Sequence, residues 1–186
     1  MINPLNNIPD NLDTSNPHSH PSLSKTRQVS TIPKDANNTQ WVFPSEAQFF
    51  TALVRKGKPV PDADIPAMLA IHNELNEQVW REIKDTWEHD SKQIFLARFR
   101  GRPNEWSPLA WLYFWRYGVR PYDRHDWIIA CDDRGKSDDQ TVFRRYVIDY
   151  YANGHGDFSC VIRPALDSFE AVKMRIRKYF FTRTPG

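Results

Sequence analysis

The chain has 186 residues, 40% of them hydrophobic, and its 25 basic and 23 acidic residues give a formal net charge of +2. This length fits one domain with a buried core, and the small charge gives no electrostatic reason to expect nucleic acid as a partner. Cys131 and Cys160 have neither zinc-ligand spacing nor the density of a disulfide scaffold. No apolar run approaches the roughly 20 residues of a membrane-spanning helix, and we see neither a signal peptide nor a conventional presequence.

The N-terminal part of the chain differs in composition from the rest. Residues 1–39 are rich in Asn, Ser, Pro and Asp and contain no Phe, Tyr or Trp. Such a segment cannot bury enough apolar surface to offset the entropy lost on ordering. We therefore expect a disordered polar tail over residues 1–39 and a single folded domain over residues 40–186. The aromatic residues all fall in that domain, which indicates a dense core or a pocket for a large flat ligand.

Two helices are expected in the first half of the domain. A capping box formed by Ser45 and Gln48 begins the first, and Gly57 suits its left-handed end. Asp64 is the expected cap of the second, longer helix, which extends to about Glu88.

Two further helices follow. Ser107 caps a short aromatic helix that stops at Gly118, and because its aromatic residues cannot share one face, some should meet a cavity or a partner. Asp167 and Glu170 form the expected capping box of a final helix. That helix ends in the basic, aromatic segment "KMRIRKYFF", which is typical either of a membrane-surface or partner-binding helix or of a docked helix with a charged outer face.

Three β-branched and aromatic runs separated by turn-rich segments predict strands. They read "HDWIIA", "RRYVIDYY" and "FSCVIRP", and their order along the chain favours an antiparallel meander. The fold class expected is α+β, with a small antiparallel sheet of about three strands packed against several helices.

The second predicted helix carries a histidine on its apolar stripe. Apolar positions and this histidine recur at steps of four, three, four and four residues, namely Met68, His72, Leu75, Val79 and Ile83. The imidazole should therefore face inward. One interpretation is a core histidine with satisfied hydrogen bonds, and the other is a metal or heme-iron ligand, because a neutral imidazole in an apolar wall suits axial ligation. Spacing alone leaves both open.

Polar residues near this histidine and near the first predicted strand are also candidates. Asn76 lies one turn beyond the histidine and can orient its ring, whereas Glu77 lies on another face and is expected to pair with Arg81. In "YDRHDWII", adjacent His125 and Asp126 suggest either acid–base chemistry or a turn with local ion pairs. No Ser or Cys nucleophile motif accompanies them, so a hydrolase is disfavoured.

Six segments occur in an order that resembles a known family. They are "WVFPSEAQFF", "RKG", "IHNELNEQVW", "PYDRHDWII", "RRYVIDYY" and "VIRPALDS". Together they resemble the signature blocks of the holocytochrome c-type synthases, also called cytochrome c heme lyases, from Trp41 to about Phe181. The resemblance implies a lyase that joins heme to the Cys-X-X-Cys-His segment of apocytochrome c, of apocytochrome c1, or of both, through two thioether bonds. It also implies a location in the mitochondrial intermembrane space, peripherally on the inner membrane.

The resemblance also assigns roles to residues. It implies that His72 is an axial ligand to the iron of heme b, the substrate, and that the histidine of the apocytochrome segment supplies the other ligand. Glu77 matches a catalytic supporting acid, with Asn73 and Asn76 beside the heme or substrate contact. The remaining matches are expected to line the heme cavity, where Arg124 can meet a propionate. They are Trp41, Arg124, His125 and Trp127.

Three departures from the family pattern bear on these roles. The tail has no Cys-Pro motif, which argues against a heme-shuttling role for it. Ala130 and Cys131 stand where an arginine is usual, and Arg134 is a candidate substitute. One propionate or substrate contact is therefore expected to differ there. Lys58 stands where an aromatic residue is expected, and together these departures are consistent with a preference for cytochrome c, for cytochrome c1, or for both.

Two other functions remain open at this point. One is a non-catalytic heme-binding or chaperone protein on the same fold. The other is an aromatic-rich nucleic-acid or protein-binding module, which the near-neutral charge disfavours.

Overall fold

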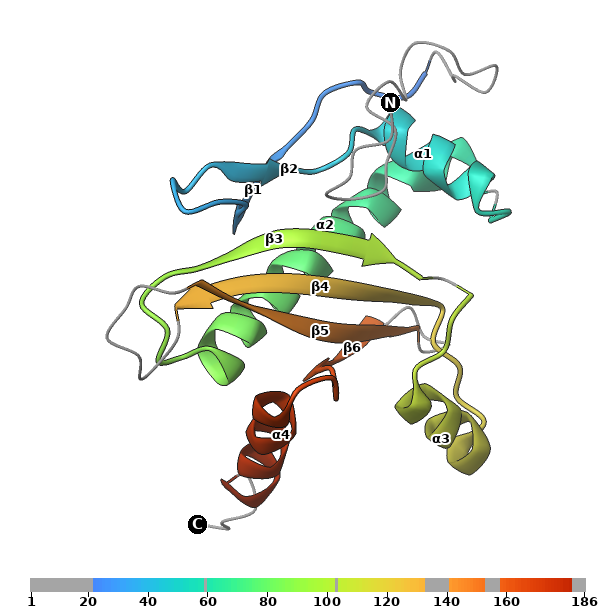
Figure 1. The fold of residues 1–186 in the computed structure, drawn as a ribbon. Coiled ribbons are helices and arrows are strands. Elements are labelled where there is room, and N and C mark those ends of the chain that lie inside the picture. Colours follow the sequence, from blue (N-terminus) through green and yellow to red (C-terminus); the bar gives the residue numbers. More distant parts are fainter. Residues whose placement is uncertain (1–21, 59, 103, 133–140, 153–157, 182–186) are drawn as a thin grey trace.

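The computed structural model describes residues 22–58, 60–102, 104–132, 141–152 and 158–181 (Figure 1). Its strands and helices, in chain order, are β1 (Val29–Pro33), β2 (Gln40–Val42), α1 (Glu46–Arg55), α2 (Ile65–Glu82), β3 (Ile94–Gly101), α3 (Pro108–Tyr117), β4 (Asp123–Asp132), β5 (Thr141–Ala152), β6 (Phe158–Pro164) and α4 (Phe169–Phe181). The α+β class is confirmed. Within the described ranges, no helix has both the length and the apolarity needed to cross a bilayer.

The main sheet has four antiparallel strands in the order β3-β4-β5-β6, and β1 pairs with β2 in a separate two-stranded sheet. The predicted meander corresponds to β4, β5 and β6. The expectation of about three strands missed β3, whose sequence is "IFLARFRG". A register shift between Leu96 and Arg98 breaks the period of two along β3, and this irregularity hides the strand from pattern analysis.

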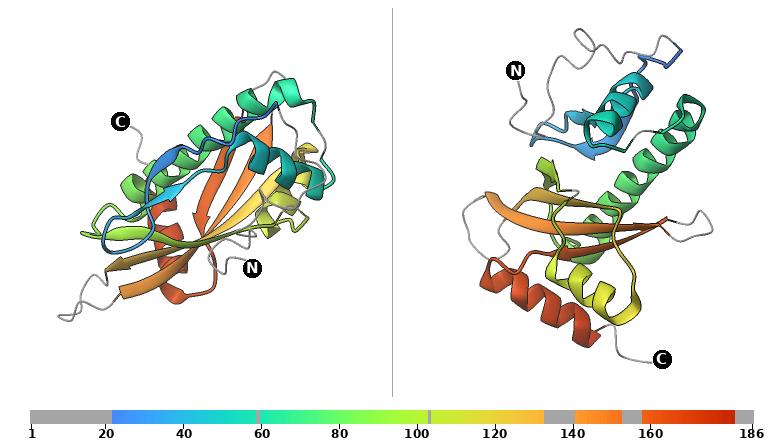
Figure 2. Two further views of the ribbon diagram at one scale, coloured as in Figure 1. Left: turned by 90° about the horizontal axis from the view of Figure 1, so that it is seen from above. Right: turned by 90° about the vertical axis from the view of Figure 1, so that its right-hand side faces the viewer.

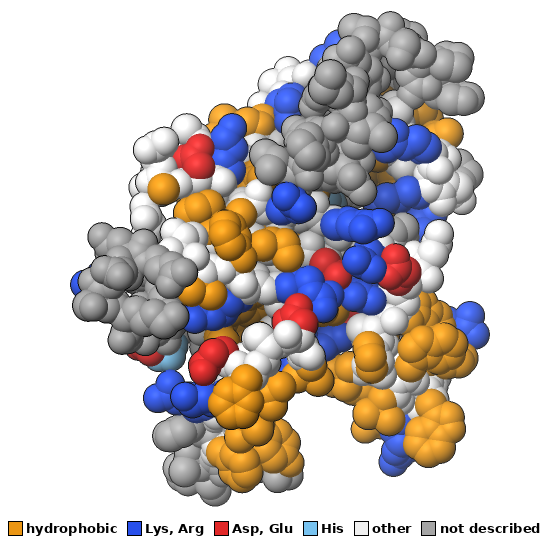
Figure 3. Space-filling view, in the orientation of Figure 1, with side chains coloured by type: hydrophobic (Ala, Val, Ile, Leu, Met, Phe, Trp, Pro, Cys, Tyr) orange, Lys and Arg blue, Asp and Glu red, His pale blue; other side chains and the backbone are white. Residues whose placement is uncertain are grey.

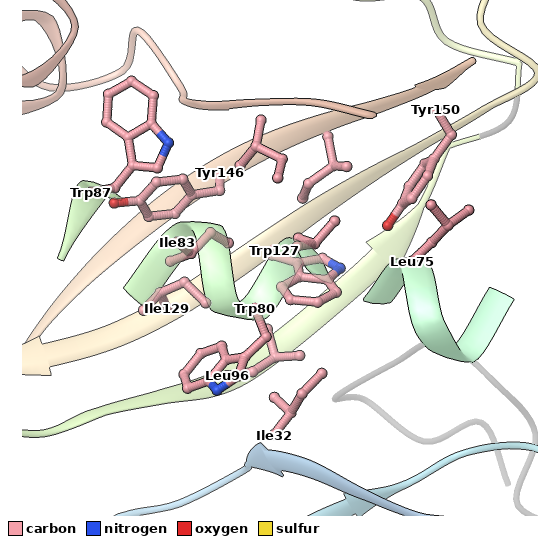
Figure 4. Close-up of a cluster of buried hydrophobic side chains, with 13 residues drawn as sticks. Ile32, Leu75, Trp80, Ile83, Trp87, Leu96, Trp127, Ile129, Tyr146 and Tyr150 are labelled. Carbon is pink, nitrogen blue, oxygen red and sulfur yellow. The ribbon is translucent and has the colours of Figure 1, made fainter. Parts of the chain in front are cut away.

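Helix α2 packs across one face of the main sheet (Figures 1 and 2) and builds the main core there. Its apolar stripe contributes Leu75, Val79 and Ile83, as predicted. Figure 4 shows the buried cluster formed with the sheet, whose strand members include Leu96, Trp127, Ile129, Tyr146 and Tyr150. Each apolar side chain of this size contributes about 1.5–3 kcal/mol when fully buried. The position of α2 on the sheet is therefore strongly fixed.

Several predicted helix ends are confirmed. The Ser45 hydroxyl accepts a hydrogen bond from the Gln48 N–H, and the Gln48 side chain accepts one from the Ser45 N–H, which completes the capping box of α1. Gly57 adopts a left-handed φ of 69° after that helix. Ser107 caps α3 by accepting from the Ala110 N–H, and the left-handed Gly118 ends it.

One predicted cap is confirmed in position only, and another is wrong. Asp64 is the N-cap residue of α2, as predicted, but its side chain makes no capping hydrogen bond, because it already lies in the 3-10 turn Asp62–Asp64 that leads into the helix. At α4 the cap lies one residue later than expected, because the Ser168 hydroxyl accepts from the Ala171 N–H. The Asp167 carboxylate instead pairs with Arg145. A π-helical turn, Ile83–Trp87, carries the predicted second helix to its expected end near Glu88.

Strand β1 lies where the sequence analysis placed the end of a polar tail. Ser30 and Ile32 are buried in this strand, and Ile32 belongs to the main core. The expected boundary between residues 39 and 40 therefore falls inside the β1–β2 hairpin. The composition of this segment is polar, but residues elsewhere in the chain bury its strand and so order it. The rest of the expected tail, residues 1–21, lies outside the described residues.

A buried polar network attaches α3 to the outer face of the sheet, opposite α2. Asp149 accepts hydrogen bonds from the Ser107 hydroxyl and the Arg163 guanidinium, and Arg163 also donates to the Ser107 hydroxyl. All three residues are buried. The ion pair therefore ties the start of α3 to β5 and β6.

Asp149→Asn should lower the free energy of unfolding by about 3 kcal/mol, because it leaves the buried Arg163 charge without a counter-ion. Asp167→Asn is the matched control, since that carboxylate also pairs with an arginine but is 44% exposed, and it should cost less than about 1 kcal/mol. Urea unfolding of both variants measures the difference. Equal effects would mean that the buried pair does not hold this region.

Candidate functional site

His72 lies on α2 where that helix meets α1. Its ring centroid is 5.3 Å from that of Phe49. The ring nitrogen Nδ1 is 3.2 Å from the Asn73 side-chain oxygen, and because this oxygen only accepts, the contact assigns the ring proton to Nδ1. The lone pair then resides on Nε2, the nitrogen that a metal would use.

A second amide steadies the same histidine. The Asn76 side-chain nitrogen donates to the His72 backbone oxygen at 2.7 Å and lies 3.3 Å from Nε2. The predicted orienting role of Asn76 therefore has a geometric basis. Burial lowers the pKa of His72 to about 4, with a further contribution from the charge of His125. The imidazole is consequently neutral near pH 7, as a ligand must be.

The sheet contributes two aromatic groups opposite His72. The Tyr150 hydroxyl donates to the Asn76 side-chain oxygen at 3.3 Å, and Figure 4 shows Tyr150 next to Leu75 of α2. Burial raises the pKa of Tyr150 well above its usual value, so the phenol remains a donor. The His125 ring lies 5.1 Å from the Tyr150 ring. Asn76 thus links His72 to the sheet.

Charged groups complete the site. The Asp123 carboxylate lies 3.5 Å from His125 Nε2 and 3.4 Å from Lys56 Nζ. Burial alone would raise the pKa of Asp123, but the hydrogen bond and charge of His125 and the charge of Lys56 bring it below its usual range. The His125 Nδ1 atom is buried and has no hydrogen-bond partner among the described residues. The site therefore combines a neutral imidazole, an unsatisfied ring nitrogen and an ion pair.

These donors fit an iron already held by a porphyrin better than a bare metal ion. Across the described residues, no group of three or more His, Cys, Asp or Glu side chains is placed to hold a metal ion. His72 instead offers a single nitrogen ligand beside Phe49. A porphyrin supplies four equatorial ligands itself and needs only axial ones from protein.

The structure brings together four of the sequence-predicted residues, namely His72, Asn73, Asn76 and His125. Trp41 lies apart from them. Its ring nitrogen donates to the Leu96 backbone oxygen at 2.8 Å and its ring packs against Phe99. Trp127 is 2% exposed and belongs to the main core. Both tryptophans therefore support the fold next to the site.

Strand alternation separates Arg124 from His125. Consecutive side chains of β4 point to opposite faces of the sheet, so Arg124 and Asp126 lie on the outer face. There Asp126 contacts the guanidinium groups of Arg124, Arg102 and Arg145 at 2.9, 3.1 and 3.0 Å. Of the two interpretations left open, the structure supports local ion pairs, in a strand and not in a turn, and the carboxylate near His125 is that of Asp123.

Glu77 holds the β1 strand against α2. Its carboxylate accepts from the Ser30 hydroxyl at 2.8 Å, from the Thr31 N–H at 2.9 Å and from the Thr31 hydroxyl. The expected pair with Arg81 is wrong, because Arg81 reaches Glu74 instead. Glu77 thus contributes to the structure around the site by holding the β1–β2 hairpin against α2.

The departures near Cys131 have a cross-strand explanation. Arg134 lies outside the described residues. The Arg144 guanidinium, from the neighbouring strand, lies 2.8 Å from the Cys131 sulfur and 2.7 Å from the buried Glu88 carboxylate. Arg144 thus places a cation beside the position where the family usually has an arginine.

Lys58 donates to the Tyr122 backbone oxygen at 2.6 Å, at the β4 end of the site.

Sequence reasoning missed Phe49, Lys56 and Tyr150 as neighbours of His72. Tyr150 belongs to an alternating run in which Tyr146 and Ile148 face the core, so its face was readable once the strand was assigned. Phe49 and Lys56 come close to His72 because α1 packs against α2, and no local sequence pattern predicts that packing.

Glu77→Ala should lower the free energy of unfolding by about 2 kcal/mol, because it removes the shared acceptor for β1. Hydrogen exchange of the β1–β2 hairpin should become faster. Glu74→Ala is the matched control on the same helix, since the Glu74–Arg81 pair is exposed and should contribute less than about 1 kcal/mol. Unchanged exchange in the Glu77 variant would contradict the assigned role.

The pKa of His72 predicts a pH-dependent stability. The unfolded state binds this proton below a pKa of 6.5 and the folded state only below about 4, so stability falls as the pH drops through this window. Between about pH 7.5 and about pH 5 the loss should be about 1–2 kcal/mol. His72→Phe should lack this part of the loss in denaturant titrations without heme. Identical pH profiles would show that the imidazole is not buried in its neutral form.

Comparisons with known proteins identify the family of this chain. A family model described as cytochrome c/c1 heme lyase matches residues 1–95 and 88–179. The holocytochrome-c synthase of Saccharomyces cerevisiae is 34% identical, over 96% of this chain and 76% of that protein. The Homo sapiens holocytochrome c-type synthase is 38% identical, over 95% of this chain and 68% of that protein. A putative holocytochrome-c1 synthase of Chaetomium thermophilum is 33% identical, over 84% of this chain and 64% of that protein.

No solved structure matches the chain. The family model covers most of the sequence, and the identities hold over most of the chain. These findings show that the chain belongs to the cytochrome c/c1 heme lyase family.

Proposed function

We propose that this chain attaches heme b covalently to the Cys-X-X-Cys-His segment of apocytochrome c or c1, with His72 Nε2 as an axial ligand to the heme iron. The observation that carries the proposal is the state of His72. Its imidazole is neutral, its Nδ1 proton is directed to Asn73, and its Nε2 is left with the lone pair. Membership of the heme lyase family supports the reaction.

The chain's own residues then act mainly by positioning. Asn73 and Asn76 hold the imidazole, and Tyr150 holds Asn76 against the sheet. Heme bound to His72 presents its vinyl groups at a fixed place, and the histidine of the apocytochrome segment would bring two thiols to them. Each thiol S–H adds across one vinyl double bond: the S–H bond and the vinyl π bond break, a C–S bond forms at one vinyl carbon, and the hydrogen is added to the other. The reacting bonds belong to heme and thiols, and the protein supplies orientation.

The cations suited to the heme propionates are Lys56 and Lys58. Arg124, the expected partner, is bound to Asp126 on the outer face of the sheet. Lys56 lies on the His72 side, at the Asp123 carboxylate, and Lys58 lies near Tyr122. An ammonium group pairs with a carboxylate through a charge-assisted hydrogen bond. We therefore assign the propionate contact to these lysines.

The chain's cysteines are poor competitors for the vinyl groups. Burial raises the pKa of the Cys160 thiol to about 11, which leaves little thiolate at pH 7. Cys131 is 2% exposed. The chain's own sulfurs should therefore not react with the vinyl groups while the substrate's thiols do.

Product release requires that the bond from His72 to iron be weaker than the ligation that the finished cytochrome builds. We further propose, from membership of the heme lyase family, that the reaction takes place in the mitochondrial intermembrane space, at the inner membrane.

Coexpression with apocytochrome c tests the proposal. Covalent heme, scored on a denaturing gel and by the pyridine hemochrome spectrum, should fall at least about tenfold in His72→Ala, because the iron loses its protein ligand. His89→Ala is the matched control, since His89 is exposed beside Asp90, and it should match the wild type.

The other outcomes are equally informative. Undiminished product in His72→Ala would remove His72 from the reaction. Bound heme without a thioether product in a folded wild type would favour a heme-binding or chaperone protein, and neither heme nor product would favour an unrelated binding module.

A further inference from the structure

Helices α3 and α4 expose a large apolar surface at one end of the molecule. Figure 3 shows hydrophobic side chains gathered on two projections there, and Figure 1 identifies these as α3 and α4. Trp115 is 82% exposed, Phe169 80% and Phe180 67%. The other exposed apolar side chains of the surface are Trp111, Leu112, Tyr117, Leu166, Ile176 and Tyr179. Soluble monomers rarely expose so many large apolar groups together without a binding role.

The exposed side chains form a stripe on each helix. On α4, Phe169, Ile176 and Phe180 are seven and four residues apart and share one face. On α3, Trp111 and Trp115 are four residues apart and also share a face. The opposite sides of the helices meet the domain, through Ala171 of α4 and Ala110 of α3, which are both buried. The two stripes therefore point away from the core.

The charges around this surface are mainly positive. Lys173 and Arg177 of α4 are exposed, and Glu170 is the acidic residue of its first turn. The sequence of α3 has a single charged residue, Arg116. Trp, Tyr and Phe side chains flanked by Lys and Arg are the composition of helices that lie in the headgroup region of a bilayer.

We propose that α3 and α4 form a docking surface for an anionic lipid bilayer, with their aromatic stripes inserted at the headgroup level. The inference rests on the proposed location at a membrane and assigns the surface that makes the contact. The occupant is argued from charge complementarity, because the cations Arg116, Lys173 and Arg177 beside the aromatic stripes suit anionic headgroups. Tyr and Trp rings with nearby cations suit an interface that is apolar on one side and wet on the other.

This orientation has a consequence for catalysis. Helix α1 and the N-terminal half of α2 lie at the opposite end of the molecule from α3 and α4 (Figures 1 and 2). Docking through α3 and α4 therefore directs the α1–α2 end, which carries His72, away from the bilayer. An apocytochrome arriving from the aqueous side would meet the site directly.

Vesicle binding by the purified 186-residue chain, without heme or apocytochrome, tests the docking surface. The probes are vesicles of phosphatidylcholine alone and of phosphatidylcholine with phosphatidylserine. The wild type should partition onto the mixed vesicles, and Trp115→Ser/Phe180→Ser should partition about tenfold more weakly. Val29→Ser is the matched control, since Val29 is 58% exposed on the distant β1 strand, and it should bind as the wild type does. Lys173→Glu/Arg177→Glu should lose the preference for phosphatidylserine.

Three results would overturn the proposal. The first is that the wild type binds neither vesicle, and the second is that the aromatic double variant binds as the wild type does. The third is that the protein is a dimer that these same substitutions dissociate, which would assign the surface to a second copy of the chain. Circular dichroism of each variant checks that it is folded. Because no heme chemistry enters the assay, a negative result leaves the synthase proposal to its own test.

Discussion

The packing of α2 across the four-stranded sheet is the constraint on which the rest of the structure depends. One face of this helix buries Leu75 and Val79 in the core while carrying His72 and Asn76 at its open end. The apolar contacts fix the helix, and the helix fixes the imidazole. The hydrogen bond from Tyr150 to Asn76 then couples the same imidazole to the sheet. Fold stability and the placement of His72 therefore depend on one set of contacts.

The alternation of side chains along β4 divides the charges of the protein between two faces. His125 and Asp123 face α2 and the candidate site, whereas Arg124 and Asp126 face outward among other arginines. An arginine on the inner face would lower the pKa of His72 further and compete for space. The outer network instead supports the face on which α3 and α4 pack. The site keeps a neutral imidazole with two lysines nearby.

Much of the fold and part of the site could be predicted from local patterns. Local patterns predict the capping box at Ser45, the helical stripe through His72 and three of the strands, because each of these depends on residues close together in sequence. The contribution of β3 was hidden by its bulge, and the partners of Glu77 lie 46 and 47 residues away. Arg124 was misassigned to the site because it is next to His125 in sequence. Successive side chains of a strand point to opposite faces of the sheet, so these two neighbours lie on different faces. Long-range packing, which a single sequence does not display, decides such cases.

The central claim is that His72 supplies the protein's ligand to heme iron, and imidazole rescue tests it most directly. Ferric heme is titrated into the wild type, His72→Gly, and His72→Gly with added imidazole, and the absorption and electron paramagnetic resonance spectra are recorded. The account predicts that the glycine variant loses the histidine-ligated spectrum and that free imidazole restores it. A glycine variant that keeps the wild-type spectrum without imidazole would contradict the claim, because another residue would then hold the iron.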